Sequence, residues 1–156
     1  MRVRVVAAGT RLPAWIDAGF TDYARRMPPE SPLELTEIAV ARRGGQGAAA
    51  RAVREEGARM LERVTPGSWV VALEATGRAL DTPDLANWWA GRLNDGRDLV
   101  FLIGGPDGLA AECLERANER LSLSPLTFPH GLARVVLAEQ LYRAASLLKG
   151  HPYHRA

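Results

Sequence analysis

Hydrophobic residues gather along the chain in short runs that are typical of β-strands. Val3 to Ala8 and Leu33 to Val40 are interpreted as two strands, and the second alternates apolar with polar positions. Trp69 to Leu73 and Leu99 to Ile103 are almost uniformly apolar, which is the pattern of strands covered on both faces in a parallel sheet. Leu121 to Phe128 supplies a further candidate strand.

The segments between these runs carry helical periodicity. Helices are expected near Pro13 to Met27, Gln46 to Val64, Thr82 to Asn94, Leu109 to Glu119 and Leu132 to Lys149. The second of these has an apolar stripe made of Ala49, Val53, Gly57, Met60, Leu61 and Val64. Glu55 and Arg59 lie four residues apart on its other face, where a solvent-facing ion pair is the simplest interpretation.

The ends of two helices and the order of the elements indicate the fold class. Thr82 followed by Pro83 is expected to cap the third helix, and Gly150 with Pro152 is expected to end the last one. The alternation of strands and helices predicts an α/β domain in which a parallel sheet lies between helical layers, an α/β/α arrangement. With 156 residues, 47% hydrophobic and 24% charged, the chain matches one domain that spans residues 1–156.

Composition excludes several classes of protein. Cys113 is the single cysteine, so no intrachain disulfide can form. No run approaches the ~18 apolar residues of a membrane span, and the expected location is the cytoplasm. With 20 basic and 18 acidic residues the formal charge is +2, which is too small to indicate a nucleic-acid binder by itself.

The basic residues are unevenly distributed, with an excess between His130 and Ala156. That segment holds Arg134, Arg143, Lys149 and Arg155 against the single acid Glu139, and all three histidines, His130, His151 and His154. Its cations suit phosphates and the rings of Tyr142 and Tyr153 suit stacking on bases, which are two elements of RNA recognition. A frayed, solvated C-terminus is the alternative that the residues leave open.

The absence of several sequence motifs excludes some classes of enzyme and of catalytic site. Lys149 is the only lysine, so no glycine-rich loop ends in the Gly-Lys-Ser/Thr of a phosphate-binding nucleotide hydrolase. The turn Ala7-Ala8-Gly9-Thr10 lacks the spaced glycines of a dinucleotide fingerprint. Acidic neighbours of Cys113 raise a thiol pKa, which makes it a poor nucleophile. His151 and His154 lack further ligands at regular spacing, so no metal site is expected.

Three segments are placed to share one ligand crevice beyond the carboxyl ends of the strands. Ile103 to Gly108 follows an apolar strand directly, and its glycines let the backbone approach a ligand closely. Leu73 to Gly77 follows the third strand, and Ser122 to His130 is hydroxyl-bearing and uncharged before the histidine. The backbone of this last segment suits an adenine edge, with Leu126 and Phe128 flanking the ring.

The loop from Arg42 to Gly47 combines two guanidinium groups with three glycines. This composition favours a mobile phosphate clamp and a simple flexible connection about equally.

These residues together resemble a known family. The chain looks like the SPOUT-class methyltransferases that methylate N3 of a pseudouridine in 23S rRNA with S-adenosylmethionine. The resemblance covers essentially the whole chain, and the order, the spacing and the terminal position of its last motif make it specific. It rests on Ala7-Ala8-Gly9-Thr10, Leu73-Glu74-Ala75-Thr76-Gly77, Leu102-Ile103-Gly104-Gly105-Pro106-Asp107-Gly108, Ser122-Leu123-Ser124-Pro125-Leu126-Thr127-Phe128-Pro129-His130, Arg134-Val135, Glu139-Gln140-Leu141-Tyr142-Arg143-Ala144 and His151-Pro152-Tyr153-His154-Arg155.

The resemblance implies a deep trefoil knot in the C-terminal part and a homodimer. It also implies a site for S-adenosylmethionine and a C-terminal tail that contributes to the substrate site. The residues implied to bind the cofactor are Leu73, Gly105, Ser124, Pro125, Leu126, Thr127, Phe128 and Pro129.

Roles for the remaining residues follow from the implied reaction. The N3 proton of the base must leave, and guanidinium groups against the neighbouring carbonyl oxygens would stabilise the developing anion. Arg143 and Arg155 are the candidates for that role, and His154 is the candidate base, with a carboxylate or water as the alternative. The candidates for substrate binding are Tyr142, His151, Tyr153, Arg42 and Arg43.

The expected partners are 23S rRNA or the whole ribosome and a second copy of the chain, with no membrane and no metal. Two other functions stay open at this point. One is a non-catalytic RNA-binding or ribosome assembly factor that has lost the cofactor. The other is a SPOUT-class methyltransferase that acts on tRNA.

Overall fold

The computed structural model describes residues 1–155, and for His154 and Arg155 the backbone alone. Its strands form one sheet in the order β2-β1-β4-β3-β5, and every pairing is parallel, as the apolar runs predict. The strands are β1 (Val3–Ala8), β2 (Leu33–Ile38), β3 (Trp69–Ala79), β4 (Leu99–Ile103) and β5 (Glu119–Ser122).

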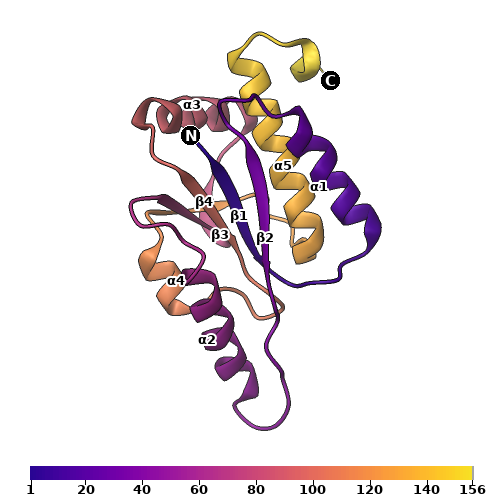
Figure 1. Ribbon diagram of the computed structural model, residues 1–156, viewed down its shortest axis with the longest axis vertical. Coiled ribbons are helices and arrows are strands. Elements are labelled where there is room, and N and C mark those ends of the chain that lie inside the picture. The colour runs from indigo at the N-terminus through magenta and orange to yellow at the C-terminus, as the bar shows by residue number, and fades with distance from the viewer. Residues whose placement is uncertain (156) are drawn as a thin grey trace.

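Helices cover both faces of this sheet (Figure 1). One face carries α1 (Ala14–Arg26), α3 (Thr82–Asp95) and α5 (His130–Leu148), and the other carries α2 (Ala48–Leu61) and α4 (Ala111–Arg116). A short 3-10 helix, η1 (Pro152–Arg155), follows α5 and packs back on it. The α/β/α arrangement expected from the sequence is therefore confirmed, while the knot implied by the resemblance stays a prediction.

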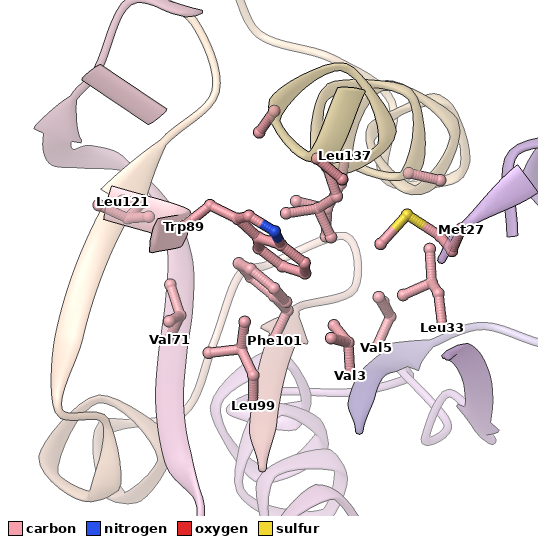
Figure 2. Packing of buried hydrophobic residues seen from close by; sticks show 14 of the residues in the cluster. Val3, Val5, Met27, Leu33, Val71, Trp89, Leu99, Phe101, Leu121 and Leu137 are labelled. Carbon is pink, nitrogen blue, oxygen red and sulfur yellow. The ribbon is translucent and has the colours of Figure 1, made fainter. Parts of the chain in front are cut away.

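The larger part of the hydrophobic core lies between the sheet and the layer of α1, α3 and α5 (Figure 2). Alternate strand residues such as Val5 and Phe101 point into it because side chains of a strand alternate between the two faces. Trp89 of α3 and Leu137 of α5 meet them from the helical side, and both are almost fully buried. The intervening strand residues, such as Leu102, pack under α2 and α4 in a second, smaller cluster.

The strand boundaries differ from the sequence expectation in three places. β2 ends at Ile38, two residues early, and β3 continues to Ala79 beyond a shift in register between Leu73 and Arg78. The extension passes so close to β5 that a Cβ on Gly77 would lie 2.8 Å from the backbone nitrogen of Leu121. β5 itself covers only Glu119–Ser122, so residues 123–128 form a loop and not a strand.

The helices differ from the sequence expectation mainly at their ends, and α2 also differs in which of its residues are buried. α3 is capped by Asp81, whose side chain accepts a hydrogen bond from the Asp84 nitrogen at 2.9 Å, so Thr82 already lies inside the helix. α2 buries Ala52 and Glu56, whereas Ala49 of the expected stripe is exposed. The buried face of α2 is therefore rotated relative to the expected stripe. It includes Glu56, whose carboxylate accepts hydrogen bonds from Ala41 and Arg43.

Two smaller expectations, one on α2 and one at the end of α5, are confirmed. Glu55 and Arg59 form the predicted ion pair at 3.9 Å on the exposed face of α2. The last helix ends at Leu148, just before Gly150, which has a φ of 67°. In the part of the chain that the structure describes, no helix combines the length and the apolar character needed to cross a bilayer.

Candidate cofactor pocket and C-terminal cluster

A cavity of about 580 Å³ lies at the carboxyl ends of β4 and β5, beside the middle of β3 where its register shifts. Its size falls within the ~300–1,000 Å³ range of small-molecule sites. The three segments singled out in the sequence do meet there, and the lining consists of residues 73–75, 103–109, 122–124 and 126–130, together with Ala133. Every residue expected to bind the cofactor lies in this lining except Pro125.

The glycines after β4 serve a tight turn. The Gly108 nitrogen donates a hydrogen bond to the Gly105 oxygen at 3.1 Å, and Gly108 has a φ of 83°, in the region that favours glycine. A Cβ on Gly104 would lie 2.5 Å from the carbonyl carbon of Gly108, so the turn closes only without a side chain there. The residues of this turn line the cavity.

The loop between β5 and α5 forms the other wall of the cavity. Its bend is held by Ser124, whose Oγ accepts a hydrogen bond from the Leu126 nitrogen at 2.9 Å. The Ser122 hydroxyl donates to the Ser124 oxygen at 3.1 Å. The Leu126 side chain is 73% exposed, which leaves it free to contact a bound ligand or another chain.

The charged groups of the cavity are mainly acidic. Oε2 of Glu74 is buried, lies 3.6 Å from Nη1 of Arg120 and has no hydrogen-bond partner among the described residues. Asp107 adds a second carboxylate on the turn. Burial, and then the charge of Arg134, lowers the pKa of His130, so its imidazole is neutral near pH 7. The cavity therefore suits a ligand that carries positive charge.

A buried arginine fixes α5 beside this cavity. Arg134 has no exposed side-chain area, and its Nη1 donates to Glu37 at 2.6 Å. Its Nη2 donates to the Gly9 oxygen at 2.8 Å and to the Ala8 oxygen at 3.3 Å. From the sequence, Arg134 is treated as one of several basic residues of the C-terminal segment, and its burial is not predicted. Its position among the apolar residues of α5 could have indicated that it is buried.

A second cluster of polar side chains lies near the C-terminal end of α5, around Glu139. The Glu139 carboxylate accepts hydrogen bonds from Nε of Arg143 at 2.9 Å and from the Tyr153 hydroxyl at 3.0 Å. The Gln140 amide donates to its second oxygen at 2.7 Å. The bond to Glu139 raises the pKa of Arg143, and burial raises the pKa of Tyr153. Glu139 is the residue of this cluster to which the sequence assigned no role.

Aromatic residues complete this C-terminal cluster. The ring centroids of Tyr142 and Tyr153 lie 4.6 Å apart, and the Arg143 guanidinium lies 5.1 Å from the Tyr153 centroid. The ring of His151 lies 6.5 Å from that of Tyr142. Tyr153 therefore anchors the tail on α5. The side chains of His154 and Arg155, expected to act in catalysis, lie outside the described residues.

The cavity lies at the first turn of α5, whereas the C-terminal cluster lies along the second half of this helix and the tail that follows it. His130 lines the cavity and Arg143 is thirteen residues further along the helix, roughly 20 Å at 1.5 Å per residue. One chain thus does not bring its own cofactor candidates and Arg143 together.

The two arginines of the loop before α2 have different surroundings. Arg42 is exposed to solvent. Arg43 turns inward and forms ion pairs with Glu56 and Asp107, both at 2.7 Å. Within the described residues, no group of three or more His, Cys, Asp or Glu side chains is arranged to hold a metal ion.

Comparisons with known proteins agree with this geometry. A family model described as predicted SPOUT methyltransferase matches residues 1–154. The chain belongs to the SPOUT methyltransferase family. It is 56% identical, over the full length of both chains, to a protein of Alkalilimnicola ehrlichii named ribosomal RNA large subunit methyltransferase H. Proteins with the same name from Thioalkalivibrio sulfidiphilus and Nitrosococcus oceani are 50% and 51% identical over at least 99% of each chain.

SPOUT methyltransferases in general use S-adenosylmethionine, and the cavity of this SPOUT chain fits that compound. The apolar and hydroxyl-bearing loop suits its adenosine part. Oε2 of Glu74 accepts no hydrogen bond from the described residues, so beside its ion pair with Arg120 it suits an ammonium group as donor.

Proposed function

We propose that this chain transfers a methyl group from S-adenosylmethionine to N3 of a pseudouridine in 23S rRNA. The observation that carries the proposal is the cavity at the carboxyl ends of β4 and β5 and the middle of β3, in which three separate motifs of the sequence meet. The names of the full-length relatives, which specify a methyltransferase of large-subunit ribosomal RNA, support the substrate class.

The residues proposed to hold the cofactor are those of the cavity wall. Leu73, Gly105 and the loop of residues 124–129 offer apolar contacts, backbone groups and hydroxyls. When bound, S-adenosylmethionine supplies an electrophilic methyl group on a sulfonium. Glu74 provides negative charge that favours binding of this cation, whereas the carboxylate of Asp107 is paired with Arg43.

The residues proposed to act on the base are those of the tail and of the end of α5. Arg143 is held in a fixed orientation by Glu139, so its guanidinium is positioned in advance to stabilise the anion left when the N3 proton departs. His154 is the proposed base and Arg155 a second cation. Tyr142, His151 and Tyr153 are proposed to contact the substrate, with Tyr153 also fixing the tail.

The distance along α5 supports the proposal of a homodimer. Methyl transfer requires reacting atoms about 3–3.5 Å apart. Arg143 and the cavity-lining residues Ala133 and His130 of the same chain are separated by roughly 15–20 Å of helix. We therefore propose that each working site combines the cavity of one chain with the C-terminal cluster of a second copy.

Most of the substrate recognition is proposed to come from the shape of the ribosome. The described residues form one α/β/α unit, whose own surface is proposed to contact the RNA. Arg42 is exposed and suited to phosphate contacts. The enzyme would work where ribosomes are, in the cytoplasm.

Calorimetric titration with S-adenosylmethionine, followed by methyl-transfer assays, tests the proposal. The expected result is micromolar binding, and methylation of ribosomal particles in preference to bare 23S rRNA and bare tRNA. Binding without methylation of any RNA would contradict the enzymatic function and favour an assembly factor. Preferential methylation of tRNA would favour the other SPOUT activity. Equal methylation of a short isolated stem-loop would contradict recognition by ribosome shape.

A further inference from the structure

A buried carboxylate lies directly beneath the glycine turn of the cavity. Glu56 of α2 is only 2% exposed. Its Oε2 accepts hydrogen bonds from the Ala41 nitrogen at 2.9 Å and from Nη1 of Arg43 at 2.7 Å. A Cβ built on Gly105 would lie 3.2 Å from its Oε1, so the carboxylate touches the turn. Buried carboxylates are rare and are retained where they are paired and hydrogen-bonded.

Arg43 connects this carboxylate to the turn itself. Its Nε donates to Oδ2 of Asp107 at 2.7 Å, while its Nη1 and Nη2 hold Glu56 and the Ala41 oxygen. Four of the five N–H groups of the guanidinium are thereby engaged within the chain. The two ion pairs raise the pKa of Arg43, so its charge is permanent.

This arrangement leaves Arg43 little capacity to bind an RNA phosphate. Its side chain is 22% exposed, and a phosphate would have to displace Asp107 or Glu56. The neighbouring Arg42 is exposed instead. Asp107 is 44% exposed and lies in the turn that lines the cavity, so its position depends on a partner that holds it.

We propose that Arg43 is a positioning residue for the cofactor site, which acts through Asp107 and Glu56 on the turn of residues 104–108. This inference rests on the proposed function, because it assumes that the cavity binds S-adenosylmethionine. Arg43 holds the turn in the conformation that accepts the ligand, and its neighbour Arg42 remains available to the RNA. The ion pair joins the loop before α2 to the turn, which lie 64 residues apart in the sequence.

A double-mutant cycle on cofactor binding tests the proposal. Arg43→Met and Asp107→Asn are made singly and together in the full-length protein and titrated with S-adenosylmethionine by calorimetry. Each single variant is expected to raise Kd about tenfold, or about 1.4 kcal/mol. The double variant is expected to resemble Arg43→Met, because loss of the guanidinium already breaks the ion pair that Asp107→Asn removes. Asp107→Glu, which keeps the charge, should recover part of the affinity.

Controls separate this role from a merely structural one. Glu55→Gln changes the neighbouring residue of α2, whose carboxylate is exposed and pairs only weakly with Arg59 at 3.9 Å, and should leave Kd unchanged. In steady-state kinetics, Arg43→Met should raise KM for the cofactor while kcat at saturating cofactor and KM for the RNA stay as in the wild type. Thermal unfolding of each variant identifies any that fail to fold, and Asp107→Asn, at a half-exposed site, provides the robust variant.

Three results would overturn the inference. Unchanged cofactor Kd in both single variants would show that the pair does not position the turn. Additive losses would mean that Asp107 contacts the cofactor directly and that Arg43 acts elsewhere. A rise in KM for RNA alone would identify Arg43 as a phosphate ligand. If the wild-type chain itself does not bind S-adenosylmethionine, the proposed function fails, and the inference fails with it.

Discussion

At the scale of single residues, the turn after β4 depends on the absence of one side chain. We expect Gly104→Ala to lower the free energy of unfolding by about 1–3 kcal/mol, because its Cβ would lie 2.5 Å from the Gly108 carbonyl carbon. Urea denaturation measures this loss. Gly91→Ala on α3 is the matched control, since its Cβ would meet nothing within 4 Å and should stabilise the helix by about 0.5–1 kcal/mol. A Gly104→Ala variant as stable as the wild type would contradict the close approach.

His130 should make the stability of the fold depend on pH. Burial and the charge of Arg134 lower its pKa in the folded state, while Glu56 opposes this shift. The unfolded state, with a pKa of about 6.5, therefore binds the proton more tightly. Stability should fall as pH decreases through about 6.5 and should be unaffected by this group above it. Unfolding measured between about pH 5 and pH 8 should show a smaller decrease for His130→Gln than for the wild type. Equal decreases would contradict this role.

The sequence pointed to some site residues and missed others for a physical reason. The turn of residues 103–108 and the loop of residues 122–130 are local features, with a composition that indicates a cavity wall in any parallel sheet. The burial of Glu56 is different, because it depends on Arg43 and on Asp107, which is distant in sequence. From sequence alone, a charged residue on a helix is expected to face solvent. Only the positions of its partners in the folded chain reveal that it is buried.

At the scale of elements, the apolar runs located β1 and β4 at their observed bounds and the other strands only in part. β3 could not be followed beyond Leu73, because residues 74–79 carry polar side chains and a glycine. Their pairing with β5 depends on tertiary contact. β5 is short because Ser124 bends the chain immediately afterwards. Local periodicity thus identified the elements, and contacts between them decided where they end.

The contact between α5 and the sheet depends strongly on Arg134. Replacing it with leucine should cost about 3–5 kcal/mol of unfolding free energy, because Glu37 would lose its cation and two backbone oxygens would lose a donor. Chemical denaturation measures this, with Arg54→Leu at an exposed position of α2 as the control expected within about 0.5 kcal/mol of the wild type. A small effect of Arg134→Leu would show that apolar packing alone holds α5.

At the scale of the whole molecule, the parallel sheet between helical layers was predictable, because four runs of apolar residues alternate with amphipathic segments. The strand order β2-β1-β4-β3-β5 was not, since hydrophobic patterning carries no information on which strands are neighbours. The same limit applies to the functional site. His130, which lines the cavity, and Arg143 belong to the same helix, yet α5 holds them thirteen residues apart.

This separation leads to a prediction on paired chains. Gly105→Leu is expected to disrupt the turn that lines the cavity, because its Cβ would lie 3.2 Å from Oε1 of the buried Glu56. Arg143→Ala is expected to disable the C-terminal cluster, so each homodimer alone should be inactive. In a heterodimer of the two variants, one composite site carries both defects and the other carries neither. Methyl transfer should then return to about half the wild-type rate per dimer, because one of two symmetric sites is intact.

The measurement uses separately tagged chains, purified as heterodimers, with calorimetry to confirm that Gly105→Leu no longer binds the cofactor. If the cavity and Arg143 worked within one chain, every site of the heterodimer would contain a defect, and no activity would return. Recovery of activity therefore distinguishes a site shared between two copies from a site formed within one chain, in which the tail would fold back over its own cavity. The prediction of a shared site rests on α5, which places Arg143 roughly 15–20 Å along the helix from the cavity-lining residues Ala133 and His130.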